Sequence, residues 1–194
     1  MAQQPVRQVR GPLERPLAKS RPDVSLSIFA FLFAEMVKHA NAAVAKAGGS
    51  IQDLEDKLHS FGLRVGARAL DLVVFREKGQ KRETRIVPML LLISKEVWKH
   101  LFNGTSTLEK SEANENEYMI NDQRLLLNRF ISVPRDMGSL NCGAFAAGIV
   151  EGILRSADFP AEVTAHTVER EKGVSTTILV RFEESVMKRE KLFV

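Results

Sequence analysis

The most restrictive feature of this sequence is an apolar segment close to its start, residues 28–34 (IFAFLFA). Its spacing predicts a helix that Asp23 or Ser25 can cap, that runs to about Lys46 and that ends at the glycine pair 48–49. Its apolar side chains lie on more than one face, whereas a surface helix of a small domain buries only one stripe. The helix is therefore either central to the core or covered on one face by another chain, and we favour the second.

The rest of the chain changes from helical spacing to alternation. Helices are predicted at 50–62, 64–77, 89–102 and 140–156. Strands are predicted at 118–121, 128–133, 162–169 and 175–182, the last two as a hairpin around Gly173, with 105–117 as an exposed polar loop. This pattern is typical of an α+β domain.

Small residues recur at two places. Gly143, Ala144, Ala147, Gly148 and Gly152 line one side of the last predicted helix, where they let another backbone approach closely. Gly66 and Ala67 are likewise small enough for close helix packing, and the spacing from Gly62 to Gly66 predicts a tight corner between two helices.

Composition bounds the domain organisation. The chain has 194 residues, 44% of them hydrophobic, and one cysteine, which fits a single soluble domain and excludes a disulfide scaffold. Residues 1–22 hold five basic residues and one acidic residue, so the remaining 23 basic and 23 acidic residues balance. The net positive charge of the chain thus belongs to residues 1–22, and a nucleic-acid-binding domain is not indicated.

We expect a flexible, proline-containing basic arm at 1–22, one domain at 23–187 and a C-terminal tail at 188–194. The arm is either a solvated terminus or a segment that orders on a partner subunit. We find no apolar run that would span a bilayer and no secretory signal, so a cytosolic location is expected.

Catalytic chemistry is not indicated. His39, His59, His100 and His166 are spread along the chain without metal-ligand spacing, and no phosphate-binding glycine motif occurs. Cys142 with His166 could form a nucleophile and base, but its place in a small-residue helix favours a buried packing role. We predict no catalytic residue, no metal and no cofactor.

A basic cluster follows the predicted third helix. Its members are Arg76, Lys78, Lys81, Arg82 and Arg85. We interpret it as a solvated loop, with a patch for anionic lipid headgroups as the alternative.

Several segments together resemble a known family. They are 25–35 (SLSIFAFLFAE), 58–68 (LHSFGLRVGAR), 130–134 (FISVP), 140–152 (LNCGAFAAGIVEG), 159–166 (FPAEVTAH) and 178–183 (ILVRFE). In this order and spacing they resemble the small subunits of the TRAPP vesicle-tethering complex, most of all the subunit-5 branch, which includes the thirty-one-kilodalton subunit of yeast. The resemblance covers about residues 13–187.

The resemblance implies helices packed on one face of a twisted four-stranded antiparallel sheet. It implies a scaffold or adaptor subunit, not itself an enzyme, of a complex that tethers vesicles and promotes nucleotide exchange on a Rab GTPase in transport from the endoplasmic reticulum to the Golgi. Implied partners are other TRAPP subunits, especially the central small subunit and sedlin, with the GTPase reached through the assembled complex. The implied location is cytoplasmic and peripheral on cis-Golgi and endoplasmic reticulum membranes.

Members of this family pair through their first helices. The resemblance and the two-sided first helix therefore predict a partner interface at Ile28, Phe29, Phe31, Leu32, Met36, Ile51, Leu54 and Leu58. The family's central subunit carries an acylated cysteine whose position falls near Arg82, which cannot be thioacylated, so we expect weak membrane contact through the basic cluster and no covalent lipid. The alternative function is a stand-alone domain that binds a small apolar ligand in a channel along the Gly/Ala helix face beside residues 89–93.

Overall fold

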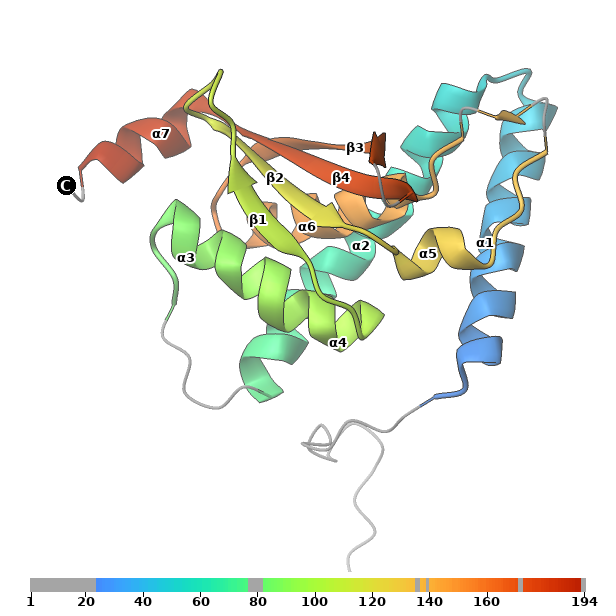
Figure 1. Cartoon of the computed structure of the whole chain (residues 1–194), viewed down its shortest axis with the longest axis horizontal. Helices are drawn as coiled ribbons and strands as arrows, with labels where there is room; N and C mark the ends of the chain where they lie inside the picture. The colour runs from blue at the N-terminus through green and yellow to red at the C-terminus, as the bar shows by residue number, and fades with distance from the viewer. Residues whose placement is uncertain (1–23, 77–81, 135–136, 139, 171–172, 193–194) are drawn as a thin grey trace, which may run out of the picture.

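We obtained a computed structural model of the protein, which describes residues 24–76, 82–134, 137–138, 140–170 and 173–192. Helices pack on one face of a four-stranded antiparallel sheet (Figure 1). The sheet order is β1 (Thr107–Lys110), β2 (Glu117–Asp122), β4 (Gly173–Phe182) and β3 (Ala161–Arg170). The predicted α+β class and sheet are confirmed.

The core lies between the sheet and the helix α6 (Gly143–Ser156). Because side chains alternate along a strand, Val163, Ile178 and Val180 face α6 and are buried. The opposite sheet face is polar, and there the Arg181 guanidinium lies 2.9 Å from the Glu117 carboxylate of the neighbouring strand. The hairpin of β3 and β4 forms as predicted.

The helix α2 runs without interruption from Ile51 to Arg76, so the predicted break at Gly62 is wrong. Gly62 and Gly66 lie on its buried face, where a Cβ would overlap the carbonyl oxygens of Phe145 and Ile149 on α6. Glycine is required at these positions because the backbones of α2 and α6 are in contact. It does not mark the end of a helix.

The next helical segment extends over residues 86–102 in three parts. They are α3 (Ile86–Leu91), the π-helical segment η2 (Leu92–Val97) and α4 (Trp98–Phe102). This segment was predicted to begin at Met89. It ends where Asn103 adopts a left-handed conformation (φ 47°), which Asn tolerates better than most residues.

Two further predictions are corrected. The loop expected at 105–117 contains the edge strand β1, which pairs with β2 in an antiparallel register. The strand expected at 128–133 is absent, because the short helix α5 (Leu126–Arg129) precedes an irregular segment that runs beside α1 (Leu26–Lys46) (Figure 1).

The domain extends beyond residue 187, where a tail was expected to begin. The helix α7 (Glu184–Lys191) packs on it, with the Arg189 guanidinium 4.7 Å from the centre of the Phe159 ring. Glu190 lies 3.0 Å from the Arg85 side chain and accepts a hydrogen bond from the Ile86 amide. The boundary at 187 therefore falls inside a docked helix.

Candidate subunit interface

The helix α1 stands at one side of the molecule, away from the sheet (Figure 1). Only Phe33 and Ala40 among its 21 residues are buried. The Phe33 ring packs 5.5 Å from that of Phe145 on α6, and Phe29 stacks on Phe33. This stripe attaches α1 to the rest of the domain.

The other face of α1 is apolar and open. Phe31, Ile28 and Leu32 are 74%, 65% and 60% exposed. By length and composition, with a mean hydropathy of 1.3, α1 meets the criteria for a helix that could cross a membrane. Core helices of soluble proteins can have the same length and composition.

The predicted interface residues fall into three groups. Ile28, Phe31 and Leu32 share the open face of α1, whereas Phe29, Met36 and Ile51 are half-buried. Leu54 and Leu58 are 1% and 0% exposed, so they belong to the core of this chain and not to its open surface. They continue the α2 face of Gly62, Gly66, Ala69 and Val73, which packs inside the domain.

The structure adds an apolar groove that the sequence did not predict. It lies between α1 and the irregular segment after α5, has a volume of about 290 Å³ and is lined by residues that include Ala34, Val37, Phe130, Met137 and Leu140. Phe130, at its rim, is 43% exposed. The apolar residues from Phe130 to Val133 were a signal, but we assigned them to a strand.

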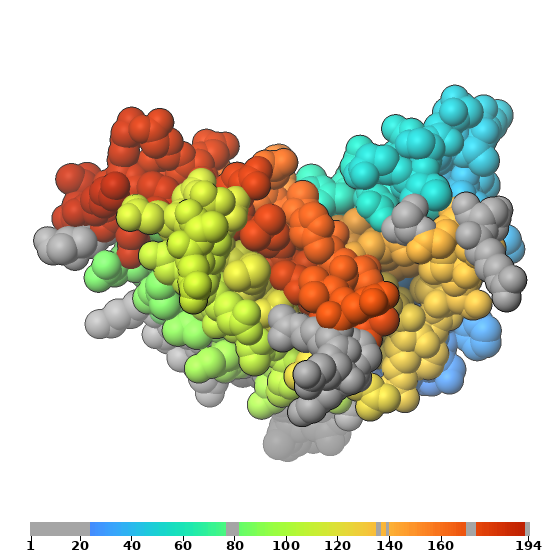
Figure 2. All heavy atoms as spheres, turned by 45° about the horizontal axis from the view of Figure 1, so that its top comes forward, coloured from blue at the N-terminus to red at the C-terminus, as the bar shows by residue number. Residues whose placement is uncertain are grey.

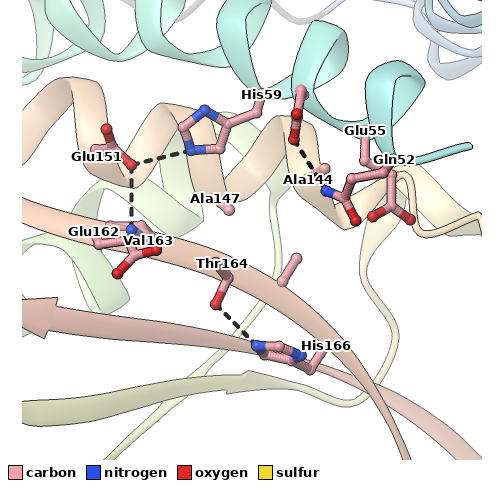
Figure 3. A pocket seen from close by; sticks show the side chains of 12 residues that line it. Gln52, Glu55, His59, Ala144, Ala147, Glu151, Glu162, Val163, Thr164 and His166 are labelled. Carbon is pink, nitrogen blue, oxygen red and sulfur yellow. Dashed lines mark hydrogen bonds and ion pairs between the residues drawn. The ribbon is translucent and has the colours of Figure 1, made fainter. Parts of the chain in front are cut away.

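A polar cleft lies between the start of α2, α6 and β3 (Figure 3). In it a Glu151 oxygen lies 3.1 Å from His59 Nε2 and accepts a hydrogen bond of 3.2 Å from the Val163 amide, and the other oxygen pairs with Arg155. Burial raises the pKa of Glu151, but the nearby His59 and Arg155 side chains and the Val163 amide outweigh burial, so the pKa lies below its ordinary 4.5. This carboxylate joins three elements.

Cys142 and His166 do not form a pair in the part of the chain that the structure describes. Burial, with the nearby Glu55 carboxylate, raises the pKa of the buried Cys142 thiol from 9.0 to about 11, which leaves little thiolate at neutral pH. The ring of His166 instead lies 2.8 Å from the Thr164 hydroxyl. Among the described residues no group of three or more His, Cys, Asp and Glu is arranged to hold a metal ion.

The small-residue face of α6 does not line a channel. A Cβ at Gly148 or Gly152 would overlap the α2 carbonyl oxygens of His59 and Leu63. The predicted close backbone approach is confirmed, and α2 makes it, so Gly148 and Gly152 do not line the apolar channel expected along this face.

The basic cluster is described only in part. Lys78 and Lys81 lie outside the described residues. Arg82 is exposed, and Arg85 is exposed but pairs with Glu190 at 3.0 Å.

An exposed apolar helix face on a folded domain is typical of the class of proteins that assemble with other chains. Residues 29–183 match the family described as Transport protein particle (TRAPP) component, and the chain belongs to this family.

Three relatives and one solved structure agree with this assignment. Proteins named trafficking protein particle complex subunit 5 from Dictyostelium discoideum and Homo sapiens are 46% and 43% identical, over 91% and 92% of this chain and 95% and 91% of theirs. The Saccharomyces cerevisiae subunit 31 is 28% identical over 89% of this chain and 80% of its own. The chain thus matches the predicted subunit-5 branch.

The solved structure of a trafficking protein particle complex subunit 3 from Naegleria fowleri, covalently bound to palmitic acid, superposes with a TM-score of 0.70. It is 18% identical and covers 82% of this chain and 95% of its own. It supports the fold.

Proposed function

We propose that this chain is a non-catalytic scaffold subunit that pairs with a second TRAPP small subunit through α1. The observation that carries the proposal is the open apolar face of Ile28, Phe31 and Leu32 on a helix of which only Phe33 and Ala40 are buried. Each such side chain contributes about 1.5–3 kcal/mol when it is fully removed from water. The domain itself offers no element that covers this face among the described residues.

The groove beside α1 extends the proposed interface. Its apolar lining at Phe130, Met137 and Leu140 adjoins the helix, so a partner helix on α1 could insert a side chain there. A central buried anchor of this kind is what most protein interfaces use for affinity.

The wider proposal follows from family membership. The partners are the central small subunit and sedlin, and the assembled complex tethers vesicles and promotes nucleotide exchange on a Rab GTPase between the endoplasmic reticulum and the Golgi. The chain would then be cytoplasmic and peripheral on cis-Golgi and endoplasmic reticulum membranes. Its own contribution is to hold the assembly together.

The test is the double variant Phe31→Asp/Leu32→Asp, expressed with the central small subunit and analysed by affinity purification and size-exclusion chromatography. Two carboxylates desolvated at the contact should abolish copurification, because unpaired charges are costly to bury. The circular dichroism and melting temperature of the variant alone should stay close to those of the wild type, since both side chains are exposed.

The matched control is Val174→Asp/Leu192→Asp, two apolar residues that are also exposed but lie on other elements. It should copurify normally. Normal copurification of the α1 variant would reject the proposed interface, and loss of its fold would place these residues in the core.

A further inference from the structure

The sheet has an open edge at β3, because β4 pairs with β3 on one side only. The Val163 amide points away from β4, since it donates to the Glu151 carboxylate. Alternation along the strand places the amides of Ala165, Thr167 and Glu169 on the same outer side. Within the described residues no other strand pairs with them, so the edge can accept a further strand.

The polar cleft adjoins this edge at residues 162–166 and is acidic. It has a volume of about 380 Å³, and carboxylates of Glu55, Asp56, Glu151 and Glu162 line it without any Lys or Arg. Figure 2 shows the hollow between the β3 side chains, in orange, and the start of α2, in cyan. Arg155 pairs with Glu151, and Arg181 lies 3.5 Å from Glu162.

The carboxylates of Glu55 and Asp56 can each pair with a positive charge on an incoming segment. Glu55 accepts a hydrogen bond from the Asn141 amide and Asp56 one from the Gln52 side chain, and neither has an ion-pair partner in the described part of the chain. A strand that enters this cleft should therefore carry positive charge.

The chain itself contains such a segment before α1. Residues 6–10 (VRQVR) are free of proline and lie between Pro5 and Pro12. Valine is favoured in strands, and Arg7 and Arg10 would project to opposite faces of an added strand. Carboxylates flank the β3 edge on both faces, with Asp56 on α2 and Glu162 on the exposed side of β3.

The segment can reach the cleft. The 21 residues of α1 span about 31 Å, from Leu26 to the end that leads into α2 (Figure 1). The first turns of α2 line the cleft. The thirteen residues 11–23 can extend over about 43 Å. We propose that residues 6–10 pair with residues 165–169 of the same chain, as a fifth strand whose end enters the acidic cleft at Ala165 and His166.

This pairing would close a strand edge that could otherwise template aggregation, and it does not depend on the function proposed above. The test is amide hydrogen exchange of the full chain, with fragments that cover residues 161–170. In the variant Arg7→Glu/Arg10→Glu, the amides of Ala165, Thr167 and Glu169 should exchange about tenfold faster than in the wild type.

The matched control is Arg15→Glu/Lys19→Glu, which makes the same charge change in the connecting part of the arm. It should keep the wild-type exchange. Equal exchange in the wild type and Arg7→Glu/Arg10→Glu would overturn the proposal, and protection that falls on dilution would overturn its intramolecular form in favour of a second copy.

A second measurement changes the cleft and leaves the arm intact. In the wild type, trypsin should cut after Lys19 about tenfold faster than after Arg7 or Arg10, because a docked strand must first open. Asp56→Lys/Glu162→Lys should equalise the three rates, whereas the exposed pair Asp71→Lys/Glu184→Lys should not. Equal rates in the wild type would contradict docking.

Discussion

Glu151 illustrates how one buried charge can organise a small domain. Its side chain is 4% exposed, yet it accepts the outward amide of β3 and pairs with His59 of α2 and Arg155 of its own helix. A buried carboxylate without such partners would be strongly destabilising. Both of its carboxylate oxygens are engaged in these structural contacts.

We expect Glu151→Gln to lower the free energy of unfolding by about 1–3 kcal/mol at neutral pH, because His59 and Arg155 lose their charged partner. The folded-state pKa of Glu151 lies below 4.5, so its contribution is present above that pH and is lost as the pH falls through the lowered pKa. Urea unfolding of both proteins across this range should show their difference shrink toward acid. Glu109→Gln, at an exposed site on β1, is the control, and a pH-independent difference would contradict this role.

At the scale of elements, the fold depends on the contact of α2 with α6. Gly62 and Gly66 on one helix face Gly148 and Gly152 on the other, and each is so close to the opposite backbone that a Cβ would overlap a carbonyl oxygen. The spacing of four residues places both glycines of each helix on one face. In this arrangement α6 lies between α2 and the sheet, and α1 lies at one side of the domain.

The substitution Gly66→Ala should destabilise the protein by about 1–3 kcal/mol, measured by thermal or urea unfolding. Alanine favours a helix over glycine by about 1 kcal/mol. Without the contact between α2 and α6, the substitution would therefore stabilise the protein. Gly104→Ala is the control, since there the nearest atoms are 3.8 Å from the added Cβ. A stabilised Gly66→Ala protein would show that α2 and α6 separate without cost.

At the scale of the whole molecule, apolar surface and excess charge belong to different segments of the chain. Ile28, Phe31 and Leu32 form an apolar surface on α1, whereas the excess of basic over acidic residues belongs, in the sequence, to residues 1–22. A second basic group lies between α2 and α3, where Glu190 offsets Arg85.

This second group should make membrane contact weak and dependent on salt. Each basic residue near an anionic surface contributes about 1 kcal/mol, and screening acts within about 8 Å at physiological salt. The protein copurified with its partners should sediment with acidic liposomes at low salt, and Lys78→Glu/Lys81→Glu/Arg82→Glu should reduce the bound fraction. Lys95→Glu/Lys99→Glu/Arg124→Glu controls for net charge, and an equal reduction by both triple variants would contradict a localised contact.

The sequence by itself determined the class of fold, the β3–β4 hairpin, the start and end of α1 and the family. These features depend on local period and on the order of several segments, both of which are readable without knowledge of contacts. The two-sided apolar surface of α1 was also predictable, because no single core face can bury side chains all round a helix.

Only the tertiary structure decided what the glycines and leucines of α2 do. Gly62 carries the local signal of a helix end, but the neighbouring α6 backbone requires a residue without Cβ there. Leu54 and Leu58 were predicted at a partner interface, but the folded chain buries both side chains in its own core. The strand edge at β3, the acidic cleft beside it and the groove beside α1 each join segments far apart in sequence, and so no local pattern specifies them.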